Sequence, residues 1–123
     1  MQLLQDIGQE FGEQAGFSPN SVETLSVAEA LGSHRLAGVS GIFALYGQDR
    51  QLLYLGCSSD MGAELKRLAA GDVSARLQLA LWRSKELLGI QVIPVPRQEL
   101  KRVYVGLRSI LKDLDQRLPL NDS

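Results

Sequence analysis

The 123-residue sequence is poor in the residues that build covalent or metal-bound frameworks. Its single cysteine, Cys57, cannot form an internal disulfide or complete a zinc cluster. Its single histidine, His34, lies next to Arg35 in a predicted loop, where a surface role is expected, and no HExxH, CxxC or glycine-rich phosphate loop occurs. No stretch approaches the ~18 unbroken apolar residues of a membrane span. These absences predict a cytosolic protein that holds no metal or other cofactor and has no membrane partner.

Basic residues are missing from the beginning of the chain. Residues 1–14 contain acids but no lysine or arginine, so they predict neither a signal peptide nor a transit peptide. Residues 1–35 carry five acidic side chains and one basic, a balance of −4, whereas residues 36–121 carry twelve basic and eight acidic, a balance of +4. Ordinary surface variation explains this difference. The sharper hypothesis is that the leader covers, or competes for, a basic face.

Hydrophobic spacing predicts alternating helices and strands. Residues 2–14 are amphipathic at helical spacing, and Ser21 is expected to cap a second helix that contains Val22, Leu25 and Leu31. Residues 42–46 and 52–55 are rich in strand-forming residues and flank a polar turn, which predicts a β-hairpin. Helices are then expected over 61–69, over about 73–82 and over 97–117, with a strand over 89–95 that Pro94 places at an edge or ends.

The predicted fold is α+β. It has a small three-stranded sheet, mixed or antiparallel, that starts with the hairpin and is flanked by helices. We expect two segments: an N-terminal helical extension over residues 1–35, and a domain over residues 36–121 that contains the sheet. The total length fits one continuous hydrophobic core.

The hairpin carries a motif. Gly41-Ile42-Phe43 is followed, after ten residues, by Tyr54-Leu55-Gly56, and this pair resembles the signature of the GIY-YIG nuclease superfamily. The family's loop and helix opening after the second element is similar to the run that contains Gly56, Ser58, Asp60 and Met61. The family's C-terminal tail is similar to Leu118-Pro119-Leu120-Asn121. The resemblance covers about residues 37–121.

The resemblance implies a specific chemistry. In such a nuclease two tyrosines lie close to the attacking water and the phosphate, an arginine supports the phosphate, and a glutamate on the last helix holds a divalent ion. Cations and metal ions at these places stabilise the charge that develops on the phosphoryl oxygens.

This sequence departs from that pattern at three of the four positions. Phe43 replaces the first tyrosine, Glu64 stands where the arginine is expected, and Leu107 stands where the metal ligand is expected, while Tyr54 is retained. A leucine offers no oxygen ligand to Mg²⁺ or Mn²⁺. Other residues can replace the missing groups. Arg67, three residues after Glu64, can replace the arginine, and Glu99 or Asp113 can supply the carboxylate from another turn of the last helix.

Two other groups of side chains are candidate functional groups. Cys57 precedes a predicted helix, whose dipole favours a thiolate, but a small space-filling role is the simpler explanation. Trp82, with Arg83 and Lys85 beside it, can stack on a base, but core packing is the simpler explanation. The remaining candidates for contact with a partner are Tyr54, Lys66, Arg67 and Arg102.

Two functions follow from the sequence. The first is a non-catalytic GIY-YIG-like domain that binds a protein or, weakly, a nucleic acid. In this case the N-terminal helices carry the interaction or form a homodimer. The second is a metal-dependent endonuclease with a rearranged active site, which requires a carboxylate near Tyr54 and Mg²⁺ or Mn²⁺. The first requires neither.

Overall fold

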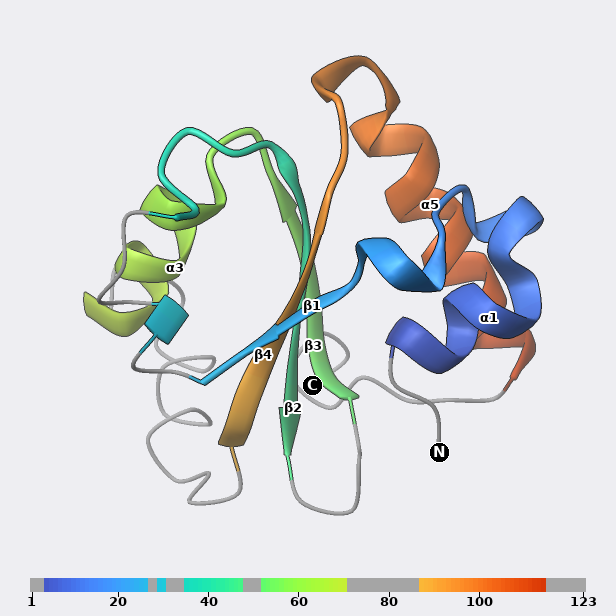
Figure 1. The fold of residues 1–123 in the computed structure, drawn as a ribbon, viewed down its shortest axis with the longest axis horizontal. Helices are drawn as coiled ribbons and strands as arrows, with labels where there is room; N and C mark the ends of the chain where they lie inside the picture. The colour runs from blue at the N-terminus through green and yellow to red at the C-terminus, as the bar shows by residue number, and fades with distance from the viewer. Residues whose placement is uncertain (1–3, 27–28, 31–34, 48–51, 71–86, 115–123) are drawn as a thin grey trace.

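A computed structural model describes residues 4–26, 29–30, 35–47, 52–70 and 87–114. Within these ranges, helices pack against one sheet, so the predicted α+β class is confirmed (Figure 1). The helices are α1 (Leu4–Ala15), the 3₁₀ turn η1 (Pro19–Ser21), α3 (Met61–Ala70) and α5 (Arg97–Asp113). The strands are β1 (Glu23–Leu25), β2 (Gly41–Gly47), β3 (Leu52–Ser58) and β4 (Leu87–Pro94).

The sheet has four strands in the order β1-β4-β2-β3, and every neighbouring pair is antiparallel. The prediction of a three-stranded sheet is therefore wrong by one strand, because β1 was not expected. The hairpin of β2 and β3 is confirmed, with Phe43 opposite Gly56 and Leu45 opposite Tyr54. Pro94 is the last residue of β4, as predicted, but β4 lies between two partners rather than at an edge. Proline fits this place because it ends the ladder without interrupting it.

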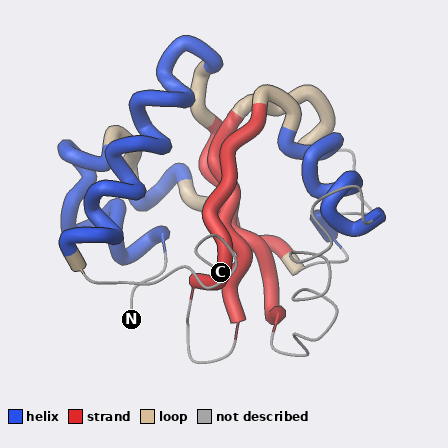
Figure 2. Tube along the Cα trace, turned by 180° about the vertical axis from the view of Figure 1, so that it is seen from behind, coloured by secondary structure: helices blue, strands red, loops and turns tan. Residues whose placement is uncertain are grey.

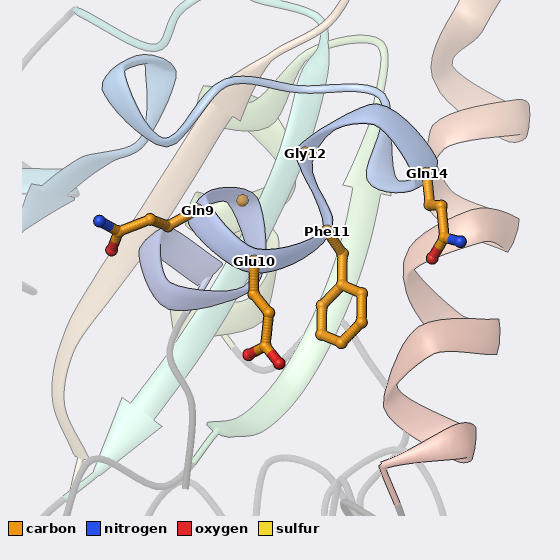
Figure 3. Close-up of a pocket in the computed structure, with 6 residues that line it drawn as sticks. Gln9, Glu10, Phe11, Gly12 and Gln14 are labelled. Carbon is orange, nitrogen blue, oxygen red and sulfur yellow. The ribbon is translucent and has the colours of Figure 1, made fainter.

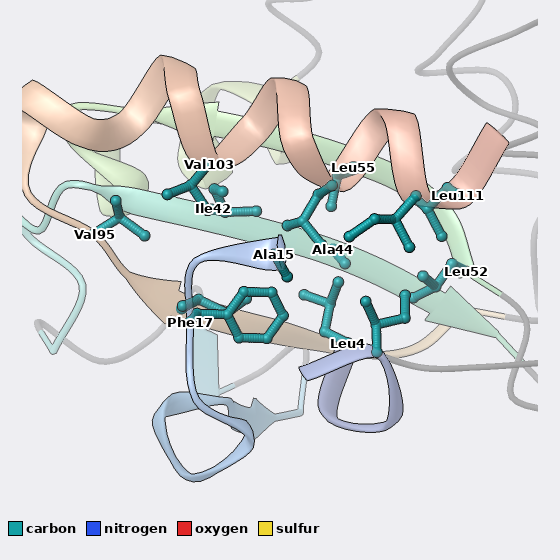
Figure 4. Close-up of a cluster of buried hydrophobic side chains, with 14 residues drawn as sticks. Leu4, Ala15, Phe17, Ile42, Ala44, Leu52, Leu55, Val95, Val103 and Leu111 are labelled. Carbon is teal, nitrogen blue, oxygen red and sulfur yellow. The ribbon is translucent and has the colours of Figure 1, made fainter. Parts of the chain in front are cut away.

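Helices cover both faces of the sheet. In Figures 1 and 2, α1 and α5 lie on one face and α3 lies on the other. Because successive side chains of a strand point to opposite faces, the buried residues fall into two clusters. The α5-side cluster includes Ile42, Ala44 and Leu55 together with Leu107 (Figure 4). The α3-side cluster includes Phe43 with residues of α3: Met61, Leu65 and Leu68.

The first correction to the predicted elements concerns residues 21–25. Ser21 does not begin a helix: its hydroxyl donates to the Ser18 carbonyl at 2.7 Å and closes the η1 turn. The next residues form β1, which pairs with β4. Val22 packs on the α5-side cluster and Leu25 on the α3-side cluster. In so short a segment, two apolar residues three positions apart are compatible with a helix or with a strand. Here the pairing with β4 stabilises the strand.

The described part of the N-terminal segment contributes side chains to the hydrophobic core. Leu4, Ile7, Ala15 and Phe17 are buried in one cluster with residues of the sheet and of α5, and Figure 4 shows Leu4, Ala15 and Phe17 in this cluster. A buried polar group fixes the start of α1: the side-chain oxygen of Gln91 accepts from the Leu4 amide at 2.9 Å, and its nitrogen donates to the Thr24 hydroxyl at 3.2 Å. Burying this amide is tolerated because both of its ends are hydrogen-bonded.

Two helices match their predicted ranges closely. The α3 helix covers the expected 61–69, and α5 begins at the expected Arg97 but ends at Asp113. The predicted helix over 73–82 and the tail over 118–121 lie outside the described residues. Among the described helices, none has the length and apolar character needed to cross a lipid bilayer.

Candidate functional site

The two aromatic residues of the hairpin motif lie on the α3 side of the sheet. Phe43 is only 1% exposed, whereas Tyr54 is partly buried, and their ring centroids are 5.9 Å apart. Gly56 lies directly beside both rings: a Cβ there would meet Phe43 Cζ at 2.6 Å and Tyr54 Cε1 at 2.9 Å. Glycine is required at position 56 because any side chain would displace these rings. The motif therefore has a packing role in this chain.

Strand β3 forms one edge of the sheet, and α5 reaches that edge. The Tyr104 hydroxyl donates to the Leu55 carbonyl at 3.2 Å. Tyr104 also lies close enough to Tyr54 to disfavour its ionisation. Sequence reasoning missed this contact. The available signal was the spacing of Tyr104, three residues before Leu107, which places it on the flank of the predicted last helix.

The position where the family has arginine holds an ion pair. The Glu64 carboxylate lies 3.4 Å from the Arg67 guanidinium, one turn along α3. The side chain of Arg67 is 58% exposed and that of Glu64 is 28% exposed. An exposed pair of this kind stabilises the helix by less than about 1 kcal/mol. The ion pair matters more for ligand binding than for stability, because an arginine paired with a carboxylate attracts phosphate less strongly than an unpaired arginine does.

The electrostatics at this edge favour neutral side chains. Burial raises the pKa of the Tyr54 hydroxyl, and Tyr104, Glu64 and Cys57 add to the effect. Burial likewise raises the pKa of the Cys57 thiol, followed by the nearby Glu64 carboxylate. The thiol of Cys57 is exposed, but its surroundings disfavour the thiolate and so do not support activation of this cysteine by a helix dipole. Tyr54 and Cys57 are suited to hydrogen bonding rather than to proton abstraction or nucleophilic attack.

Asp60 organises the loop between β3 and α3. Its carboxylate accepts from the amides of Ala63 at 3.1 Å and Gly38 at 3.0 Å, so it caps α3 and ties the helix to the segment before β2. These amides, the Ala63 amide first, hold the pKa of the Asp60 carboxyl below its usual range. The resemblance to the family's loop thus corresponds here to a helix cap.

The position of the family's metal ligand lies on the other face of the sheet. Leu107 is fully buried in the α5-side cluster, whereas Phe43 and Tyr54 belong to the α3-side cluster. An apolar side chain packed in the core does not fit Mg²⁺ or Mn²⁺, which bind oxygen ligands. Within the described ranges, no three histidine, cysteine or acidic side chains are grouped to hold a metal ion. The residues present therefore do not form the metal site that the resemblance implies.

The four candidate contact residues do not form one surface. Tyr54 and Arg67 both lie near Glu64, and Lys66 lies near Asp60. Arg102 lies on α5, where it pairs with Glu99 at 3.1 Å and its guanidinium borders Gly16.

Other candidates fall elsewhere. Glu99 and Asp113 are exposed residues of α5 and are not grouped with Tyr54. His34, Trp82, Arg83 and Lys85 lie outside the described residues.

A separate hollow lies over α1, where the helix is kinked at Phe11 (φ −124°, ψ 24°) (Figure 3). It is lined by Gly8, Gln9, Glu10, Phe11, Gly12 and Gln14, all from this one helix. None of the residues predicted to contact a partner lines it. The hollow follows from the break in the helix and from the two glycines that flank it.

No model of a known protein family matches this sequence, and no curated protein is similar to it at a significant level.

Proposed function

We propose that this chain is a non-catalytic binding module with a GIY-YIG-like core. Three features support the resemblance: the antiparallel hairpin that carries the motif, the helix that follows Gly56, and the order of a further strand and a last helix. The fold alone does not decide function, so the proposal rests on the side chains at the motif positions.

The observation that carries the proposal is the burial of Leu107. A hydrolytic site of the family's type needs its metal ligand and its tyrosines to converge on one phosphate. Here Leu107 is fully buried among apolar side chains, and Arg67, the candidate substitute for the phosphate-binding arginine, is paired with Glu64. These features argue against a metal ligand at position 107 and against strong phosphate binding by Arg67. They leave an edge of the sheet with exposed hydrogen-bonding groups.

The proposed binding surface is the edge formed by β3 and α3, with Tyr54, Cys57, Glu64 and Arg67 as its contact residues. The partner is a protein or a nucleic acid. Binding to nucleic acid through this edge should be weak because Glu64 repels phosphate. The single cysteine fits a reducing compartment, so we place the protein in the cytoplasm.

The second function, a metal-dependent endonuclease with a rearranged site, is favoured by one observation. Glu64 lies near enough to Tyr54 to raise its pKa, so a carboxylate does stand beside the retained tyrosine. That carboxylate is engaged with Arg67. If it serves a metal, the ion pair must open.

Cleavage assays separate the two functions. Supercoiled plasmid and single-stranded oligonucleotides are incubated with the protein in Mg²⁺ or Mn²⁺, beside Tyr54→Phe and Glu64→Gln. We expect no cleavage by any of the three proteins. Metal-dependent cleavage that co-purifies with the wild-type chain and disappears in both variants would establish the nuclease instead.

A further inference from the structure

The last helix, α5, carries a row of basic side chains along one flank. Its buried side consists of Val103, Leu107, Ile110 and Leu111. At about 100° per residue, four basic positions fall within an arc of about 60° on another side of the helix. These positions are Arg97, Lys101, Arg108 and Lys112. We call them the α5 basic row, and it extends over about 22 Å at 1.5 Å per residue.

Two contacts show which flank the row occupies. Tyr104, next to the row on the helical projection, bonds to Leu55 of β3, so the row lies on the flank nearer the open edge of the sheet. On the opposite flank, Arg102 borders Gly16 and pairs with Glu99, and a Cβ at Gly106 would lie 3.5 Å from the Gln14 carbonyl. The acidic α1 and the turn after it contact that second flank, and Figure 1 shows α1 beside α5. The chain's own acidic helix therefore does not cover the basic row.

Three of the four side chains in the row form no ion pair with the residues that the structure describes. Arg97, Lys101 and Lys112 are exposed and form no ion pair with a described residue, whereas Arg102 is paired. Like charges one turn apart on a helix repel each other. A complementary anion on this flank would relieve that repulsion and would be drawn to it over long range.

An apolar residue lies beside the middle of the row. Val105 is 56% exposed, the larger of the two exposures found among large hydrophobic side chains in the described residues. The phosphate backbone of a nucleic acid has no apolar group that would cover a valine, whereas a protein segment has both carboxylates and apolar side chains. We propose that this face of α5 binds an acidic protein segment that places an apolar side chain against Val105. This inference uses no motif residue and does not depend on the proposed function.

The proposal can be tested with defined peptides and the full chain. The probe is a synthetic peptide with glutamate at every fourth position and one central leucine. A matched peptide carries serine in place of the leucine. Titration by calorimetry or fluorescence anisotropy at low and at high salt should show tighter binding of the leucine peptide and weaker binding of both peptides as salt rises.

Adjacent residues of α5 provide the controls. Lys101→Glu and Arg102→Glu change the net charge equally but lie on different flanks. We expect Lys101→Glu to weaken binding by about fivefold to tenfold, and Arg102→Glu to change it less than about twofold. Val105→Ser should abolish the preference for the leucine peptide over the serine peptide. Circular dichroism of each variant checks that the fold is retained, as expected for exposed positions.

Four results would overturn the proposal. The first is equal weakening by the two glutamate variants, which would show a general charge effect. The second is the absence of peptide binding at low salt. The third is tighter binding of a single-stranded oligonucleotide, unaffected by Val105→Ser, which would assign the row to nucleic acid. The fourth is self-association that Lys101→Glu prevents, which would make a second copy the occupant.

Discussion

At the scale of single residues, the motif positions show that a residue can be retained for packing without the catalytic role that the resemblance implies. Tyr54 keeps the side chain that the resemblance requires, yet burial and its neighbours raise the pKa of its hydroxyl and so make ionisation harder. Phe43 occupies the other tyrosine position and is buried, where a hydroxyl would need a partner. Gly56 is needed because two rings lie against it. The motif residues thus serve core packing in this chain, and their presence alone does not identify a nuclease.

The thiol of Cys57 gives the first prediction. Only the thiolate reacts with iodoacetamide, and both burial and Glu64 raise the pKa of this thiol. We expect slow alkylation at pH 8 relative to a free cysteine. Glu64→Gln removes one of the two causes and should speed the reaction about two- to fivefold. The rate is measured by mass spectrometry of the intact protein.

A matched control for this experiment is Glu99→Gln. Glu99 is also a carboxylate paired with an arginine three residues later, but it lies on α5 and is not a cause of the shift at Cys57. Its replacement should leave the alkylation rate unchanged. Equal acceleration by both variants would show that loosening of a helix, and not the local charge, controls the thiol.

At the scale of elements, strong local signals were sufficient where neighbours in sequence are neighbours in space. The hairpin, α3 and the start of α5 were predicted because their apolar periods and turn residues are local. The strand β1 was missed because three residues carry almost no period and its partner β4 lies far along the chain. The contact of Tyr104 with Leu55 was missed for the same reason, since it joins residues 49 apart.

The N-terminus of α3 gives the second prediction. The pKa of Asp60 is lowered from its ordinary value of 3.8, because the amides of Ala63 and Gly38 donate to its charged form. A lowered pKa stabilises the fold above the unfolded-state value, and this stabilisation is lost as the pH falls through the lower, folded-state value. Asp60→Asn retains a capping side chain but removes the charge. The variant should unfold at lower urea than the wild type at pH 7.

The pH dependence distinguishes charge from shape at Asp60. The difference between wild type and Asp60→Asn should be constant from neutral pH down to about pH 5 and should then shrink as the pH falls below 3.8. Urea midpoints measured at several pH values provide this comparison. A difference that stays the same at pH 3 would mean that the geometry of the cap, and not its charge, stabilises α3.

The central turn of α5 gives the third prediction. Leu107→Glu restores the family's metal ligand but places a carboxylate where the side chain is fully buried. A buried, unpaired carboxylate should lower the free energy of unfolding by about 4 kcal/mol or more. Leu107→Met keeps the volume and the apolar character, so it should cost less than about 1.5 kcal/mol. Chemical denaturation measures both variants.

The result at Leu107 also tests the residue equivalence that the resemblance implies. If Leu107→Glu were as stable as Leu107→Met and bound Mn²⁺, the position would face a polar groove. Position 107 would then still have surroundings that accommodate a metal ligand. The packing of Leu107 with Leu55 and Ile42 in one cluster predicts the opposite outcome.

At the scale of the whole molecule, charge and packing divide the chain differently. By charge, residues 1–35 form an acidic unit and residues 36–121 a basic one. By packing, the two are continuous, since β1 extends the sheet and α1 shares a cluster with α5. The hypothesis that the leader covers a basic face fits only the flank near Arg102, and the α5 basic row lies on the other flank. Sequence alone cannot distinguish a detachable cover from a core element of the same composition.

The last prediction concerns removal of the leader. Deletion of residues 1–35 removes β1 and six buried apolar side chains: Leu4, Ile7, Ala15, Phe17, Leu25 and Ala30. Burying one large apolar side chain contributes about 1.5–3 kcal/mol, and a domain of this size has only about 5–15 kcal/mol of stability. The shortened chain should therefore lose its cooperative thermal transition. Differential scanning calorimetry and circular dichroism measure this loss.

A full-length variant with fewer acidic side chains separates the packing role of residues 1–35 from the role of their charge. Asp6→Asn combined with Glu10→Gln removes two of its acids without removing a residue of the core. This variant should keep its cooperative transition, because substitutions away from the core usually change stability by less than about 0.5 kcal/mol each. Any effect of the leader's charge on binding of an acidic peptide can then be measured on a folded protein. If instead the chain without residues 1–35 melts cooperatively near the wild-type temperature, residues 36–121 are an independent domain, and the burial of Leu4, Ile7 and Phe17 contributes little to its stability.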